Sequence, residues 1–123
     1  MKADSRQDLR KRTSEYALRI INLYTVLPKR NPGQVIANQL LRSGTSVGAN
    51  YAEGCRSRSD ADFINKHEIC LQEFEETAYW LELLTDAEII KEERIQLLKE
   101  ETKELLAIFT SIVRTTKNRI RKS

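Results

Sequence analysis

The amino-acid sequence predicts an all-α fold, an antiparallel four-helix bundle in up-down-up-down order. Only two prolines and four glycines interrupt 123 residues, of which 32% are charged, and this composition is typical of long helices. Apolar residues also recur at spacings of three and four along four long segments. Short connections between helices of similar length favour antiparallel neighbours. A chain of 123 residues has the length of one domain, so we expect a single domain over residues 1–123.

The first half of the chain predicts a helical hairpin. Its first helix is expected from about Asp4 to Leu27, and Pro28 ends it because the residue before a proline avoids the helical region. The apolar face consists of Leu9, Tyr16, Ile20, Leu23 and Leu27. In the next turn, Asn31 is expected to cap the second helix and Pro32 to take its first position. That helix runs to about Arg56, with an apolar face of Ile36, Leu40, Val47 and Tyr51.

The second half predicts another hairpin. Ser59 is an N-cap candidate for a third helix that runs to about Ala87, and Asp60 and Asp62 suit the positive end of its dipole. Its core face is Phe63, His67, Cys70, Phe74, Thr77, Leu81 and Leu84. After a short break around Glu88 to Lys91, a fourth helix of about 30 residues is expected. Its core-facing residues are spaced alternately three and four apart, as in a coiled coil. Its seam is Ile95, Leu98, Thr102, Leu105, Phe109, Ile112 and Thr116.

The stretch LRSGTSVGANYAEG, residues 41–54, holds three of the four glycines. A phosphate-binding P-loop needs a lysine and then Ser or Thr after its last glycine, whereas Gly54 is followed by Cys55 and Arg56. On a helix, Gly44 and Gly48 lie beside the apolar face and leave a groove in which another helix can approach closely. Each glycine costs about 1 kcal/mol of helix propensity relative to alanine, and close packing is the expected compensation.

Two side-chain stripes predict an interface between copies of the chain. On the second helix the stripe is polar but mostly short, which favours contact with a partner over simple solvation; it consists of Arg42, Ser46, Asn50 and Glu53. On the third helix Ile69, Trp80 and Leu83 lie outside the core face, with Glu73 and Glu76 among them. An outer stripe that contains a tryptophan favours self-association. The alternative is a tryptophan that lies flat against its own helix.

The residues that could carry catalysis or hold a metal do not form a recognisable site, so we expect no enzyme, no metal and no cofactor. His67 is the only histidine and lacks the Glu-x-x-His spacing of di-iron bundles, so a position at the edge of the core is expected. Cys55 and Cys70 flank the second turn at positions more than about 10 Å apart along a helical hairpin, too far to share zinc. Glu53 and Glu76 have no nucleophile beside them.

Positive charge is predicted to gather at one end of the bundle, although the net charge is only +3. The start of the first helix, the second turn and the end of the fourth helix share one pole in this topology. Together they carry Arg6, Arg10, Lys11, Arg12, Arg56, Arg58, Lys117, Arg119, Arg121 and Lys122, here called the basic pole. No aromatic platform is expected among these cations, which favours contact with the backbone of RNA or DNA over base stacking.

The chain is also expected to be cytoplasmic. The N-terminal stretch MKADSRQDLRKR is polar and lacks the apolar segment of a signal peptide. No run approaches the roughly 20 apolar residues that span a bilayer, so no membrane contact is expected.

The stretch 41–54, followed by FINKHEICLQEFEETAYWLELL, resembles the four-helix bundle proteins found in intervening sequences of bacterial 23S ribosomal RNA genes. The resemblance depends on Ser46, Asn50, Glu53 and Gly54, and on Glu76 before an aromatic and leucine-rich helix end. Gly48 departs from it, since many relatives carry proline there, and implies a straighter second helix. The resemblance implies a ring-shaped homopentamer. Similar accessory proteins of diversity-generating retroelements bind nucleic acid and a reverse transcriptase.

Two functions of different class follow from these patterns. The first is a non-enzymatic, oligomeric scaffold that binds RNA or DNA through the basic pole. The second is a protein-interaction adaptor whose basic pole is only a solvated helix end, since cations near the end of the fourth helix suit its dipole. That dipole argument does not cover Arg10, Lys11 and Arg12, which lie near a helix start.

Overall fold

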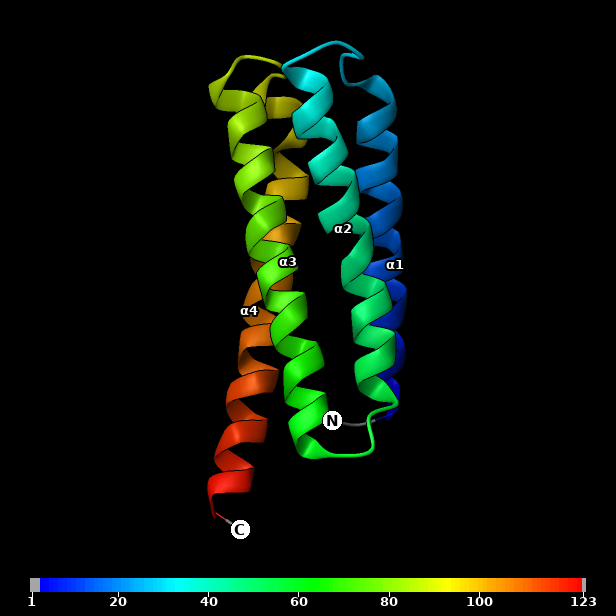
Figure 1. Ribbon diagram of the computed structural model, residues 1–123, viewed down its shortest axis with the longest axis vertical. Coiled ribbons are helices and arrows are strands. Elements are labelled where there is room, and N and C mark those ends of the chain that lie inside the picture. Colours follow the sequence, from blue (N-terminus) through cyan, green and yellow to red (C-terminus); the bar gives the residue numbers. More distant parts are fainter. Residues whose placement is uncertain (1–2, 123) are drawn as a thin grey trace.

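The computed structural model describes residues 3–122, with side chains from Arg6 onward except that of Gln7. Four helices follow one another: α1 (Ala3–Val26), α2 (Gly33–Cys55), α3 (Asp60–Asp86) and α4 (Glu92–Lys122). They lie side by side with alternating direction, so the predicted up-down-up-down arrangement is confirmed (Figure 1). No strand occurs between residues 3 and 122.

The ends of the helices follow local chemistry, with one correction to the prediction. Ser59 caps α3 as expected, because its hydroxyl accepts a hydrogen bond of 3.1 Å from the amide of Asp62. At α2, however, Pro32 takes the N-cap position and Gly33 is the first helical residue. Proline has no side-chain acceptor, so α2 starts without the side-chain cap that was predicted from Asn31. The α3–α4 turn includes Glu88 with a φ of 58°, a left-handed residue that reverses the chain.

The core is the apolar seam that the spacing predicts. All five residues of the first apolar face are buried, and six of the seven predicted on the third helix are buried as well. On α4 the seam shifts near its end, where Val113 is buried and Ile112 only partly so. The spacings after Leu105 are therefore four, four and three, in place of the four, three and four that the sequence predicts, and Thr116 is again buried as expected.

Aromatic rings from all four helices meet near the middle of the core. Phe109 of α4 contacts Phe74 of α3 and Tyr51 of α2, with ring centroids 5.2 and 5.5 Å apart in edge-to-face geometry. Tyr16 of α1 packs against Phe74 at 5.6 Å. Its hydroxyl lies 2.7 Å from Thr102 Oγ1, and since Thr102 donates to the Leu98 carbonyl, Tyr16 is the donor. This buried hydrogen bond joins α1 to α4, the pair of neighbouring helices that approach each other least.

The glycine-rich stretch lies inside α2, which runs without interruption through Gly48. Gly44 faces α1, where a Cβ would lie 2.7 and 2.9 Å from Cγ1 and Cγ2 of the fully buried Ile20. Gly48 is looser, since a Cβ there would lie 3.4 Å from Thr13 Oγ1. The groove expected from the two glycines is therefore a close contact at Gly44 and an ordinary one at Gly48.

We predict opposite effects for two Gly→Ala changes on α2. Gly44→Ala forces a methyl group into Ile20 and should destabilise the fold by about 1–3 kcal/mol, even though alanine favours the helix. Gly48→Ala should be neutral or stabilise by up to about 1 kcal/mol, because ordinary contact distance is available. Urea denaturation followed by circular dichroism measures both. Equal effects would show that close approach to α1 does not explain Gly44.

Candidate nucleic-acid interface

The three segments of the basic pole lie at the same end of the bundle. The start of α1, the turn between α2 and α3, and the end of α4 meet at the lower end in Figure 1. The last turns of α4 extend beyond the other helices there (Figure 1). The geometry predicted from the connectivity is therefore present, and the partners of each cation decide which of them are available to a ligand.

The side chain of Arg12 points toward α4 and forms ion pairs with it. Its Nε and Nη2 donate to the two carboxylate oxygens of Glu101 at 2.9 and 2.7 Å, and Nη2 also lies 2.8 Å from Glu104. The paired guanidinium holds the pKa of the Glu101 carboxyl below its ordinary value. With two carboxylates around it, Arg12 joins α1 to α4 and adds no net positive charge to the pole.

Two further cations of the pole have acidic neighbours but remain open to solvent. Lys117 lies 3.3 Å from Glu68, and Arg119 donates to Asp60 at 3.0 Å. All four side chains are about half exposed or more. Exposed pairs of this kind contribute at most about 1 kcal/mol, so a polyanion can compete for them.

The remaining cations of the pole are exposed. None of them makes an ion pair with the residues that the structure describes: Arg6, Arg10, Lys11, Arg56, Arg58, Arg121 and Lys122. Arg121 donates only to the neutral side chain of Asn118. Among the described residues, the exposed acidic groups near the same end include Asp8, Asp60, Asp62 and Glu68. Positive charge therefore dominates this surface even when Arg12, whose charge is compensated, is not counted.

A hollow of about 680 Å³ opens within the basic pole. Arg6 of α1, Arg58 of the turn and Arg119 of α4 line it, together with Phe63 at the start of α3. The apolar spacing predicts Phe63 in the core, and no aromatic ring was expected among the pole arginines. The structure places Phe63 half-buried beside them, so that expectation is wrong. The sequence did contain one sign of this exposure: Phe63 lies only one turn after the Ser59 cap, so it is near the end of the helix, where the core ends.

His67 lies one helical turn further into the bundle than Phe63 and is fully buried, deeper than the core edge expected for it. Its ring stacks on Phe63 with centroids 3.9 Å apart, and Phe109 and Tyr51 close its other sides. Nδ1 donates to the Phe63 carbonyl at 2.8 Å, so the neutral ring carries its proton there. Nε2 is buried without a partner among the described residues, and a Cβ on Gly54 would lie 2.9 Å from the ring.

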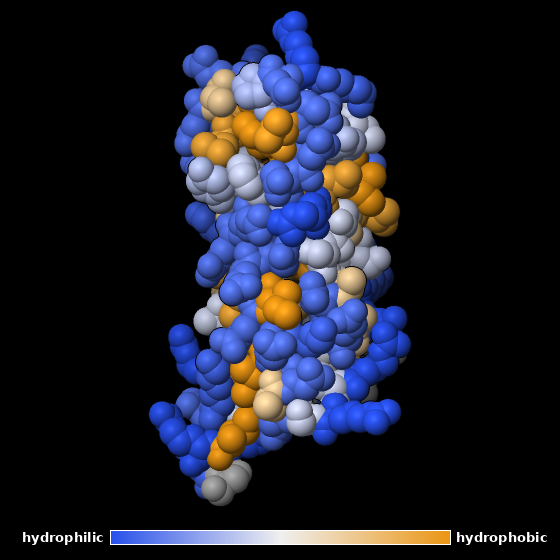
Figure 2. Space-filling model, viewed as in Figure 1, coloured by the Kyte–Doolittle hydropathy of each residue, from blue (hydrophilic) through white to orange (hydrophobic). Residues whose placement is uncertain are grey.

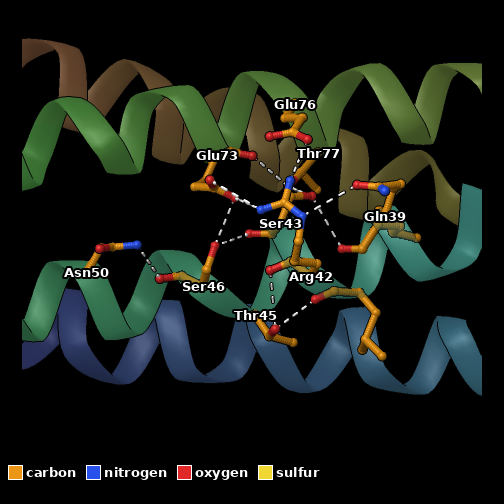
Figure 3. A network of polar contacts seen from close by, with 11 residues as sticks. Gln39, Arg42, Ser43, Thr45, Ser46, Asn50, Glu73, Glu76 and Thr77 are labelled. Carbon is orange, nitrogen blue, oxygen red and sulfur yellow. Dashed lines mark hydrogen bonds and ion pairs between the residues drawn. The ribbon is translucent and has the colours of Figure 1, made fainter.

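The polar stripe of α2 meets α3 of the same chain (Figure 3). Arg42 lies 3.2 Å from Glu73 and forms a short ion pair with Glu76. Ser46 donates to Glu73 at 2.9 Å, and Glu53 accepts from Lys66 at 2.7 Å.

Asn50 donates to the carbonyl of Ser46, one turn before it on the same helix. The stripe was expected to meet a second subunit; the structure pairs much of it internally, although Arg42 and Glu53 remain about half exposed.

The apolar stripe of α3 is half-buried beside these polar contacts between α2 and α3. Ile69, Trp80 and Leu83 are all of intermediate exposure, and Trp80 packs against the core of its own chain. The Trp80 Nε1 is buried and finds no acceptor in the described residues. Its neighbour Tyr79, with a side chain 56% exposed and a ring 5.0 Å from that of Trp80, is the more open aromatic group. Tyr79 was not among the interface residues predicted from the sequence.

The cysteines and carboxylates form no metal site in the part of the chain that the structure describes. Both cysteines are free; Cys55 is half-buried and lines the hollow, whereas Cys70 is buried, and burial raises the pKa of its thiol to about 12. Among residues 3–122, no helix is long and apolar enough to cross a membrane.

Comparison with known proteins finds both a matching family and similar solved structures. Residues 6–111 match the model of a family described as 23S rRNA-intervening sequence protein. The chain is also similar to the crystal structure of a protein of unknown function from the S23 ribosomal protein family of Bacteroides thetaiotaomicron. The two chains are 42% identical, the match covers 85% of this chain and 96% of the other, and the TM-score is 0.79. No curated protein matches the chain.

We predict that His67 makes the fold sensitive to mild acid. Burial lowers the pKa of His67 below its ordinary value of 6.5, so as the pH falls the unfolded chain takes up the proton first. The free energy of unfolding should therefore decrease below about pH 6.5, by up to about 1.4 kcal/mol per pH unit, until the folded-state pKa is passed. Urea titrations between pH 7.5 and 5 measure this slope.

His67→Leu is the matched control, because the chain has no other histidine. In that variant the decrease between pH 6.5 and 5 should disappear. An equal slope in both proteins would assign the effect to carboxylates instead.

Proposed function

The chain belongs to the family of 23S rRNA-intervening sequence proteins, and from that premise we propose that it is a non-catalytic, oligomeric scaffold that binds RNA or DNA. The site is the basic pole, and its ligand is the phosphate backbone. The observation that supports this most is the gathering, at one end of the bundle, of exposed cations from α1, the α2–α3 turn and α4. Cations so arranged concentrate a polyanion and release its counterions on binding.

The cations of α1 favour a ligand over a purely structural role. Cations in the last turn of α4, such as Arg121 and Lys122, stabilise the negative end of that helix by about 0.3–1 kcal/mol each. Arg6, in the first turns of α1, gains nothing from the dipole, and Arg10 and Lys11 lie beyond its reach. These three residues form no ion pair with the described residues, so an external anion is the partner that accounts for them.

We also propose that the chain forms a homo-oligomer, with a ring-shaped pentamer as the assembly implied by the resemblance to its family. Support comes from the half-exposed stripe of α2 and α3 described above and from several exposed apolar side chains. On the face shown in Figure 2, apolar side chains gather in patches, one of them over the end where α2 begins and α3 ends. Subunits that point the same way in a ring would place their basic poles on one side and combine them into one broad positive surface.

A protein-interaction adaptor is the second candidate function. It is favoured by the exposed apolar side chains of Tyr79, Val35 and Leu97, which are 56, 55 and 72% accessible. Single exposed apolar groups are common on soluble proteins, so this observation is weaker than the clustering of charge.

We predict that nucleic-acid binding depends on the basic pole. Replacing Arg10, Lys11, Arg56 and Arg58 with Gln should weaken binding at least about tenfold at low salt. It should also reduce the slope of log affinity against log salt by roughly 0.9 for each phosphate that the variant no longer neutralises. Fluorescence anisotropy with labelled RNA and duplex DNA at two salt concentrations measures both effects.

The matched control removes the same amount of charge from the opposite end of the bundle, by replacing Lys29, Arg30, Lys91 and Arg94 with Gln. This variant should bind nearly as the wild type does. If the wild type binds neither nucleic acid at low salt, or if both variants bind alike, the pole is not the site and the adaptor becomes the better hypothesis.

We predict that light scattering at micromolar concentration gives a mass several times that of the 14.3 kDa chain. Trp80→Glu should shift the protein toward smaller species, because a buried charge without a partner is costly. Since Trp80 also packs on its own core, a circular dichroism melt must show that the variant is folded. Gln72→Glu, which adds the same charge at an exposed polar position of α3, is the control and should leave the mass unchanged. A mass of one chain for the wild type would contradict self-association.

A further inference from the structure

The hollow in the basic pole differs from the rest of that surface because it combines cations with an apolar wall. Arginines from three parts of the chain line it, Arg6, Arg58 and Arg119, and Phe63 and Ile112 line it as well. Its volume of about 680 Å³ falls within the range of about 300–1,000 Å³ found for small-molecule sites. A simple phosphate would use the arginines and leave the apolar wall uncovered.

Phe63 is held in a fixed orientation. One face of its ring is stacked on the buried His67, with an angle of 25° between the rings, so only the other face or the edge can meet a ligand. Gly54 permits this arrangement, because a side chain there would collide with His67. A rigid aromatic surface next to arginines is the arrangement that binds an unpaired nucleic-acid base, since every base has a face that can stack.

The cations around Phe63 suit the phosphate of the same nucleotide. Arg6 and Arg58 are exposed and form no ion pair with the described residues. Arg119 is paired with Asp60, whose carboxylate is the one acidic group among the described residues that line the hollow, and its charge is already compensated. Ser57 also lines the hollow, and its buried hydroxyl has no hydrogen-bond partner in the described part of the chain, so rotation of this side chain offers a polar group to a base edge.

We infer that the hollow binds one nucleotide of a single strand, with its base against Phe63 and its phosphate between Arg6 and Arg58. The inference rests on the proposed function and narrows it from any polyanion to strands with unpaired bases. In a duplex the bases are paired and stacked, so one would have to be extruded to reach Phe63. The protein should therefore bind a single strand more tightly than a duplex of equal length.

The first test compares two variants of the full chain on two substrates. Phe63→Leu keeps an apolar side chain but removes the ring, and should weaken binding of a labelled 12-nucleotide single strand about tenfold while leaving affinity for the duplex unchanged. Arg56→Gln, at the pole but outside the hollow, should weaken both to a similar degree. Equal binding of the single strand by Phe63→Leu and the wild type would overturn the inference.

Failure of the proposed function gives a different result, because the wild type would then bind neither substrate at low salt. Binding of both substrates with no effect of Phe63→Leu would leave the basic pole as a backbone-binding surface and reject only the stacked base.

A second test does not depend on the stability of Phe63→Leu. In a Trp80→Phe background, Phe63→Trp places the chain's single tryptophan in the hollow, where a stacked base quenches its fluorescence. We expect saturable quenching by the single strand and none by the duplex. Absence of quenching at strand concentrations that saturate the anisotropy would reject the inference. Quenching by adenosine 5′-monophosphate alone, without a response to the strand, would reject it in favour of a free nucleotide.

Discussion

The structure depends on the close approach of α2 to both of its neighbours, which is possible because α2 carries glycine at two contact points. Gly44 leaves room for Ile20 of α1, and Gly54 leaves room for the His67 ring of α3. Protein interiors are packed like organic crystals, so a methyl group at either point would push a neighbouring helix outward. In the core beside these two contacts, Tyr51 of α2 packs edge-to-face against Phe109 of α4, with ring centroids 5.5 Å apart.

The contact at Gly54 links core packing to the surface of the basic pole. His67 occupies the space above Gly54, and Phe63 stacks on His67 and continues into the hollow. Gly54 thus leaves room for the buried ring of His67, and His67 in turn orients the half-exposed ring of Phe63. Arg58 lines the same hollow as Phe63. His67 Nε2 has no hydrogen-bond partner among the described residues, and a hydrophobic residue of similar size would avoid this buried polar atom, so stability alone does not explain the histidine. Its flat ring gives Phe63 a stacking surface that an aliphatic side chain would not.

The charged side chains separate into two groups according to what they face. Arg12, Arg42 and Lys99 face neighbouring helices and are bound by two carboxylates each, which fixes the register of α1 on α4, α2 on α3, and α3 on α4. Such partly exposed pairs contribute little net stability, so their main effect is to select one arrangement of helices that otherwise share similar apolar seams. At the pole, Arg10 and Lys11 point outward, form no ion pair with the described residues and remain available for a polyanion.

The four helices, their order and most of the core follow from local patterns in the sequence, because the apolar spacing, Pro28 and the Ser59 cap each act over only a few residues. The sequence also determined that the cations gather at one pole, since this follows from connectivity alone. Which of these cations remain available to a ligand depends on contacts between helices that are far apart in the sequence. Arg12 pairs with Glu101 and Glu104, which the fold places opposite it on α4. Likewise, the spacing puts Phe63 on the core face of α3, but the ring lies half-buried beside Arg6 and Arg119, because the bundle core ends there and three separate segments enclose a hollow.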